Sequence, residues 1–96
     1  AFALASNYEG LPAVLVEALA AGLPIAATNS APGIADLIAG FGTLAPVQEA
    51  ASLARALESL RHARPDRAAM LERAMQFTAQ RAAPLYIDVF KRLTLY

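Results

Sequence analysis

The first half of the chain alternates short apolar runs with polar turns. Residues 1–6 are almost entirely apolar and end at the polar turn 7–10, a pattern typical of a buried strand. Residues 23–28 form a second apolar run, with Pro24 near its beginning, where a strand tolerates the missing N–H. Residues 42–45 are a third, weaker candidate. The pattern therefore predicts three buried strands.

Helical patterns separate these strands. Residues 12–21 begin with Pro12, which suits the first turn of a helix, and stop at Gly22. Residues 34–39 form a shorter predicted helix that Gly40 closes. Because strands and helices alternate and the strands are apolar throughout, the fold class is predicted to be α/β, with a parallel sheet covered by helices.

The second half of the chain is predicted to be helical. Between Glu49 and Pro65 the apolar positions share one face, and Asp66 is a candidate N-cap for a second helix. Pro84 is expected to break or kink this helix before a last amphipathic stretch. The apolar residues of the two C-terminal segments are Met70, Ala74 and Phe77, then Tyr86, Val89, Phe90, Leu93 and Tyr96, whose side chains are expected to pack.

We interpret residues 1–96 as one partial domain, with a βαβαβ core in residues 1–48 and C-terminal helices in residues 49–96. The composition indicates that the domain is only part of a larger one. Hydrophobic residues make up 57% of the chain and charged residues only 17%, whereas about 25% charged is ordinary. A small domain cannot cover so much apolar surface by itself, so we expect faces that meet something outside the chain.

Charge and residue types exclude several functions. Eight basic and eight acidic residues balance, without a run of Lys or Arg, which argues against nucleic acid as a partner. The absence of cysteine excludes disulfides and fits a cytoplasmic protein. The longest apolar stretch, residues 11–27, is interrupted by proline, glycine and glutamate, so we predict neither a membrane span nor a signal peptide. No acidic pair or His cluster has metal-ligand spacing, and His62 is given no role.

Two carboxylates near the first predicted helix are the candidate chemistry. Glu17 is the only charged residue on a helix that is otherwise apolar, so we expect the helix to be buried and Glu17 to bind hydrogen-bond donors elsewhere. Glu9 lies just before the helix, roughly 7–8 Å from Glu17 along its axis at ~1.5 Å per residue. No Ser, Thr, Asp or Asn directly precedes Pro12, so the amides of the helix N-terminus lack an obvious cap.

Uncapped amides after a parallel strand are a typical site for an anionic phosphate. Carboxylates on either side suit hydroxyl groups flanking a diphosphate. A nucleotide-sugar has this layout, with ribose hydroxyls, two phosphates and sugar hydroxyls in order.

The stretch from Ser6 to Gly22, followed by LPIAATNSAPGIADLI, resembles the donor site of retaining GT-B glycosyltransferases, the group 1 glycosyl transferases with a Glu-x7-Glu motif. That family includes many bacterial polysaccharide and lipid glycosyltransferases. The resemblance implies the second half of a Rossmann-like C-terminal donor domain and a hexosyltransferase-like reaction. It implies that Glu9, as the catalytic residue, contacts the transferred sugar and that Glu17 holds the ribose. It also implies that the amides of Gly10 and Leu11, with the helix start at Pro12, approach the diphosphate.

The resemblance also implies the partners. The donor would be a nucleotide diphosphate sugar and the acceptor a glycan or a lipid carrier, with no cofactor and no metal. An N-terminal domain and an upstream basic pair for the diphosphate would be missing, so we expect the chain alone to be inactive. Separately, the open edge of the first strand and the apolar composition lead us to expect self-association through that edge. The expected location is the cytoplasm, including the inner face of the membrane. Asn29 and Asp36 depart from the family pattern, and no role is carried over to them.

Simpler interpretations stay open. Glu17 could be a structural carboxylate, Glu9 an ordinary turn residue, and Gly10 a residue that serves only the turn. The chain could then be a non-catalytic nucleotide- or phosphate-binding module, which has no need of Glu9. It could also be a structural half-domain that assembles with another chain and binds no ligand. The C-terminal stripe could likewise dock on a second domain.

Overall fold

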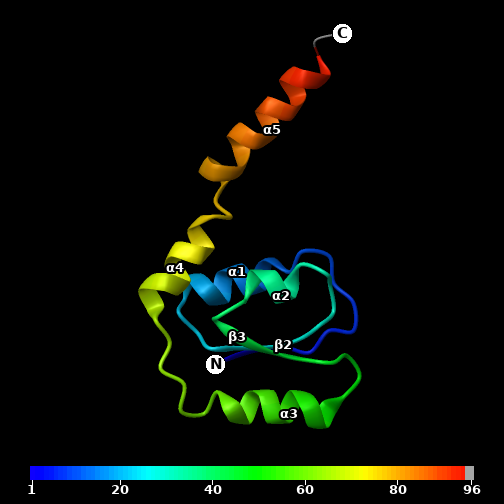
Figure 1. Cartoon of the computed structure of the whole chain (residues 1–96), viewed down its shortest axis with the longest axis vertical. Helices are drawn as coiled ribbons and strands as arrows, with labels where there is room; N and C mark the ends of the chain where they lie inside the picture. Colours follow the sequence, from blue (N-terminus) through cyan, green and yellow to red (C-terminus); the bar gives the residue numbers. More distant parts are fainter. Residues whose placement is uncertain (95–96) are drawn as a thin grey trace.

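The structure, a computed structural model, describes residues 1–94. Strands and helices alternate over the first half, and helices make up the second (Figure 1). In chain order the elements are β1 (Phe2–Leu4), α1 (Ala13–Ala20), β2 (Ile25–Thr28), α2 (Ile34–Leu37), β3 (Gly42–Ala45), α3 (Ala50–Ser59), α4 (Arg67–Met75) and α5 (Ala79–Leu93). Tyr96, predicted above to pack, lies outside the described residues.

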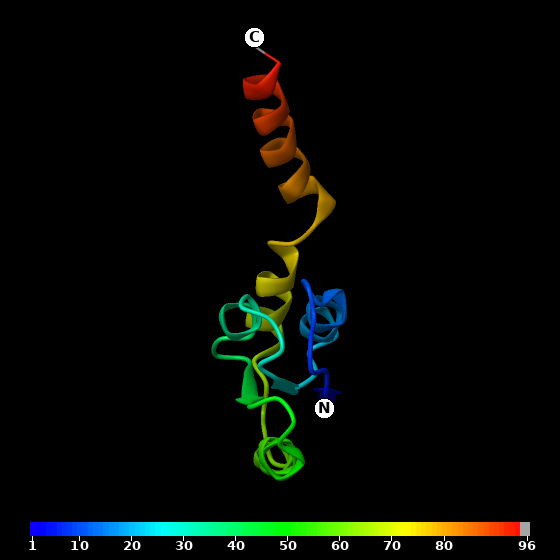
Figure 2. The same ribbon diagram turned by 90° about the vertical axis from the view of Figure 1, so that its right-hand side faces the viewer.

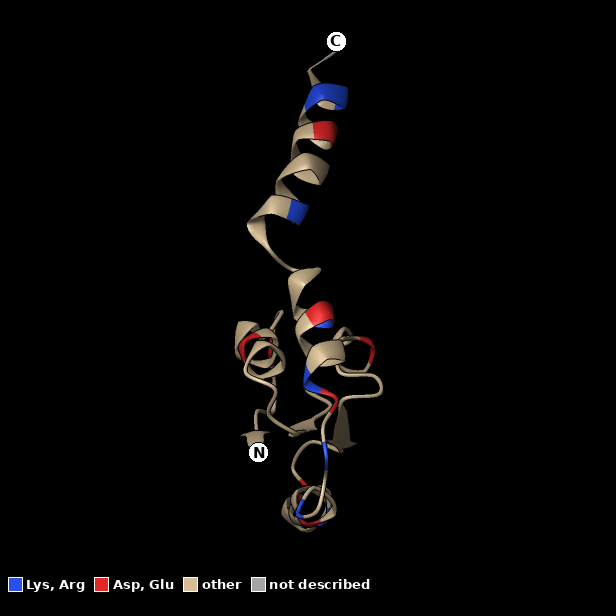
Figure 3. Ribbon diagram, turned by 90° about the vertical axis from the view of Figure 1, so that its left-hand side faces the viewer, with Lys and Arg blue, Asp and Glu red and all other residues tan. Residues whose placement is uncertain are grey.

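The three strands form one parallel sheet in the order β1-β2-β3. Phe2 pairs with Ile25, and Ile25 pairs in turn with Gly42. The strands contain no charged residue, and charges are confined to the helices and loops (Figure 3). The predicted α/β fold, a parallel sheet with C-terminal helices, is confirmed.

Helices cover both faces of the sheet (Figures 1 and 2). Alternate residues of β2 face opposite sides, as the pleat of a strand requires. Ile25 and Ala27 join the main core, which α1, α2 and α4 complete on one side, whereas Ala26 packs with Ala45 and Ala56 under α3. All four residues of β2 are buried, which explains its continuous apolar run.

Gly22 ends α1 as predicted. Its φ of +70° lies in the left-handed region that glycine adopts without strain. The aliphatic part of Arg67, at the start of α4, packs where a Cβ would lie, 2.8 Å from that position at its nearest atom. A side chain at Gly22 would therefore have to displace the stem of Arg67.

The helix start predicted at Asp66 is confirmed, since its Oδ1 accepts a hydrogen bond of 3.0 Å from the Ala69 amide. The break predicted at Pro84 is wrong. The helices separate at residues 76–78, where Thr78 caps α5, and Pro84 lies inside α5. Because no residue of α5 is buried, water can bond the carbonyl that Pro84 leaves unpaired.

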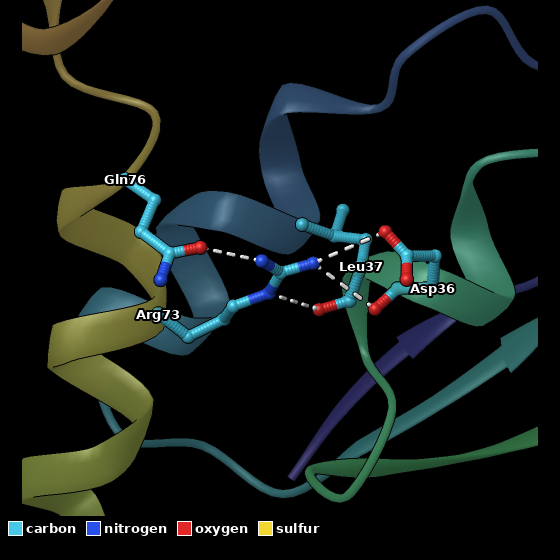
Figure 4. A network of polar contacts seen from close by, with 4 residues as sticks. All are labelled: Asp36, Leu37, Arg73 and Gln76. Atoms are coloured by element: carbon cyan, nitrogen blue, oxygen red, sulfur yellow. Dashed lines mark hydrogen bonds and ion pairs between the residues drawn. The ribbon is translucent and has the colours of Figure 1, made fainter.

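Arg73 ties α4 to the end of α2 (Figure 4). Its guanidinium donates to the carbonyl oxygens of Leu37 and Asp36 at 3.2 and 3.1 Å, and to the Asp36 carboxylate at 3.4 Å. It also donates to Gln76 Oε1 and stacks 5.3 Å from the centre of the Phe77 ring. The carbonyls at a helix C-terminus lack partners within the helix, so Arg73 acts as the cap of α2.

α5 stands away from the rest of the molecule and extends its longest dimension to 54 Å (Figures 1 and 2). Its amphipathic pattern is as predicted, but its aromatic side chains do not pack on the core. Tyr86 and Phe90 contact each other, with ring centres 6.5 Å apart, and both are more than half exposed. Within residues 1–94, no helix is long and apolar enough to cross a membrane.

Candidate functional site

The loops that follow the strands meet at one edge of the sheet, because the carboxyl ends of parallel strands lie together. The Glu9 amide donates to the Ser30 carbonyl at 3.0 Å, which joins the loop after β1 to the loop after β2. The Asn29 amide donates to the Ala45 carbonyl at 2.8 Å, which joins β2 to the end of β3. Backbone hydrogen bonds within the chain therefore hold the loops at this edge together.

Glu9 lies half-buried in the first of these loops. The Ser6 hydroxyl donates a hydrogen bond of 2.6 Å to its Oε1. With the amide bond to Ser30, this fixes both the backbone and the side chain of Glu9.

Thr28, the last residue of β2, fixes the preceding turn. Its side chain is buried, with 4% of the residue exposed, and its hydroxyl donates to the Ser6 carbonyl and, at 3.3 Å, to that of Leu4. This role of Thr28 was not predicted from the sequence. The signal was present, since Thr28 is the only hydroxyl residue in a strand that is otherwise apolar and buried.

The N-terminus of α1 has no side-chain cap, as predicted, because Pro12 precedes the first helical residue with an extended backbone and no polar side chain. At Gly10, two residues earlier, the space that a Cβ would occupy is empty of other atoms to 4 Å, apart from the adjoining residues, and φ is not in the left-handed region. Neither packing nor backbone geometry within the described chain requires glycine there. The surface is open, and the next residue, Leu11, is exposed.

Glu17 differs from its expected environment. It lies on the exposed face of α1, with Val14 beside it, while Leu15, Ala18 and Leu19 are buried on the opposite face. Within residues 1–94 its carboxylate makes no hydrogen bond or ion pair. The expectation of a buried helix is wrong, because the other elements cover only one side of α1.

A cavity of about 280 Å³ opens at the same edge of the sheet. Its walls come from the ends of β1 and β2 and the start of α3: Ala5, Asn7, Thr28, Gln48, Glu49, Ala50 and Leu53. Gln48 has a φ of 59°, a conformation that residues with side chains rarely adopt. Glu9, Gly10 and Glu17 do not line this cavity. Glu9 and Gly10 lie in the loop after β1, whereas Glu17 lies in the second half of α1.

The remaining candidates have other roles or none. Asp36 pairs with Arg73, Asn29 is exposed, and His62 is exposed at the end of α3. A second cavity, of about 500 Å³, lies at the opposite edge of the sheet beside Phe41 and Met70, away from Glu9. In the part of the chain that the structure describes, no three His, Cys, Asp or Glu side chains gather in a group able to hold a metal ion.

An α/β protein with its polar loops gathered at the carboxyl edge of a parallel sheet belongs to a broad class of ligand-binding folds. Residues 1–77, from β1 through α4, match the model of the family described as glycosyl transferases group 1. The chain belongs to this family, and α5 lies beyond the matched residues.

A curated relative supports the same assignment. A protein of Haemophilus influenzae described as an uncharacterized glycosyltransferase is 51% identical over 37 residues, which are 38% of this chain. The match covers 10% of the length of that protein. No solved structure matches the chain.

Proposed function

We propose that this chain forms part of the donor site of a retaining GT-B glycosyltransferase that uses a nucleotide diphosphate sugar. Residues 1–48 would supply the second half of the Rossmann-like donor domain, and residues 49–96 its C-terminal helices. An N-terminal domain would bind the acceptor, a glycan or a lipid carrier. The family supports glycosyl transfer in general, and the site supports the finer assignment.

One observation carries the proposal: Glu9 lies before the uncapped N-terminus of α1, and Glu17 lies after it on the exposed face of the same helix. The partial positive charge of a helix N-terminus favours an anionic diphosphate, whereas carboxylates favour hydroxyl donors. The exposure of Glu17 is compatible with a ligand on the open face of α1. The open surface at Gly10 supports close approach of the diphosphate to the backbone.

These features give each residue a role. Glu17 would accept hydrogen bonds from the ribose, and Glu9 would accept them from the transferred sugar. The amides of Gly10 and Leu11 and the helix start at Pro12 would stabilise the charge that develops on the leaving diphosphate. Retention of configuration and the Glu-x7-Glu assignment rest on the resemblance of this stretch to GT-B enzymes.

The test uses the enzyme that contains this chain. Glu17→Ala should weaken the binding of the matching nucleoside diphosphate by ~1.5–3 kcal/mol, the range for hydrogen bonds to a charged group, without loss of folding. Isothermal titration calorimetry with the common nucleoside diphosphates measures this. Glu58→Ala is the matched control, because Glu58 is an exposed glutamate on α3, which covers the face of the sheet opposite to α1. Unchanged affinity in the Glu17 variant would refute the ribose assignment.

Glu9 separates an enzyme from a binding module without turnover. In a transferase, Glu9→Ala should reduce sugar transfer while the affinity for the nucleoside diphosphate stays near that of the wild type. A protein that only binds nucleotide would show no transfer in either form. A structural half-domain would bind none of the nucleotides.

A further inference from the structure

We propose that Ser6 is a positioning residue for Glu9, and that it selects which carboxylate oxygen meets the donor sugar. The inference rests on the proposed role of Glu9 and adds a residue that the resemblance did not supply. Ser6 acts through Glu9 and does not itself touch the sugar.

A hydrogen bond joins the side chains of Ser6 and Glu9. Ser6 Oγ donates to Glu9 Oε1 at 2.6 Å, so this oxygen is already engaged. Hydrogen bonds to an ionised acceptor are short and about twice as strong as neutral ones. The second carboxylate oxygen, Oε2, accepts no hydrogen bond within residues 1–94 and is left for a hydroxyl of the donor.

The backbone on both sides of this bond is also fixed. Thr28 donates from its hydroxyl to the Ser6 carbonyl, and the Glu9 amide donates to the Ser30 carbonyl at 3.0 Å. Thr28 and Ser30 are themselves buried, with 4% and 7% exposed, so the turn from Ser6 to Glu9 is anchored to the rigid end of β2. An unrestrained glutamate side chain would lose rotamer freedom when sugar binds, and Ser6 removes part of that cost in advance.

A purely structural role for Ser6 is the competing explanation. In that case the hydroxyl would only stabilise the turn, and its loss would disturb the neighbouring helix start as well as Glu9. Nucleotide affinity would then fall together with sugar transfer. A positioning role predicts that the two quantities separate, because Glu9 is assigned to the sugar and not to the nucleotide.

The experiment measures both quantities in the enzyme that contains this chain. Ser6→Ala should lower kcat/KM for the nucleotide sugar about tenfold, the effect of one hydrogen bond to a charged group. The Kd for the nucleoside diphosphate should not change. Ser6→Thr keeps the hydroxyl and should restore kcat/KM. Ser59→Ala is the control, because Ser59 also makes a 2.6 Å bond, but to the Ala56 carbonyl at the end of α3.

A double-mutant cycle completes the test. If Ser6 acts through Glu9, Ser6→Ala should cause no further loss in the Glu9→Ala background. The inference is overturned if the two losses multiply, if Ser6→Thr is as slow as Ser6→Ala, or if Ser6→Ala alone matches the wild type. Normal transfer by Glu9→Ala would overturn the proposed function too, whereas a slow Glu9→Ala beside a normal Ser6→Ala overturns only the role of Ser6.

Discussion

Gln48 occupies a backbone conformation that suits glycine better than glutamine. Its φ of 59°, two residues before α3 begins, places its Cβ close to a backbone oxygen, at a cost of about 1–2 kcal/mol. Gln48→Gly removes this strain but increases the entropy of the unfolded chain. We therefore expect the free energy of unfolding to rise by about 0.5–1 kcal/mol, measured by urea denaturation.

A neighbouring residue provides the control for this substitution. Ala51 lies in the first turn of α3 with an exposed side chain, so Ala51→Gly should lower stability by about 1 kcal/mol. If Gln48→Gly also lowered stability, the side chain of Gln48 would contribute more than its backbone strain costs.

At the residue level, the sequence predicted the positions of Glu9 and of the start of α1 along the fold better than it predicted the surroundings of the side chains. The placement of Glu9 after β1 and the missing cap before α1 follow from neighbouring residues. The exposure of Glu17 does not follow from its neighbours in the sequence, because the burial of a helix face depends on which elements pack against it. The role of Thr28 was missed for the same reason, since its acceptors lie 22 and 24 residues earlier in the chain.

Among the elements, the junction of α2 and α4 depends on Arg73. Arg73→Met keeps much of the aliphatic stem but removes the donors to two carbonyls, and we expect a loss of about 1–2 kcal/mol in the free energy of unfolding. Thermal or urea denaturation measures the change. Asp36→Asn, the control, should have little effect, because the Asp36 side chain is 92% exposed and its ion pair is a surface pair. A larger effect from Asp36 than from Arg73 would contradict the capping role of Arg73.

Proline and glycine explain why element boundaries were mostly predictable. Gly22 ends α1 and Pro12 precedes its first residue, so the residues at its two ends determine where this helix begins and stops. Pro84, in contrast, does not mark the end of a helix. In an exposed helix the lost hydrogen bond can be replaced by water, so the break occurs instead at residues 76–78, where Thr78 supplies a cap.

For the whole molecule, the edge of β1 that faces away from β2 should promote self-association of the 96-residue chain. The Phe2 amide donates to Pro24, so the neighbouring Ala3 amide points to the open edge. We expect light scattering to give a mass above 10.1 kDa that falls on dilution. Ala3→Pro removes the free donor without breaking the pairing with β2, and it should shift the chain toward a monomer.

The exposed apolar face of α5 offers a second route to association, and a second variant separates the two. Replacing Leu85 and Phe90 together by glutamate would prevent contacts through α5 and leave β1 unchanged. If only this variant became monomeric, the strand edge would not be the interface. A wild-type chain that is monomeric at every concentration would contradict both routes.

The strand order has a consequence for how the sheet is made. Within residues 1–94, strands pair only with their neighbours along the chain, so each pairing closes a segment of about twenty residues and none waits for a distant part of the sequence. Such short segments close quickly, and α1 or α2 can cover each new pair as soon as it forms. Within these residues the sheet can therefore grow strand by strand during synthesis, because each new strand pairs with the strand made just before it.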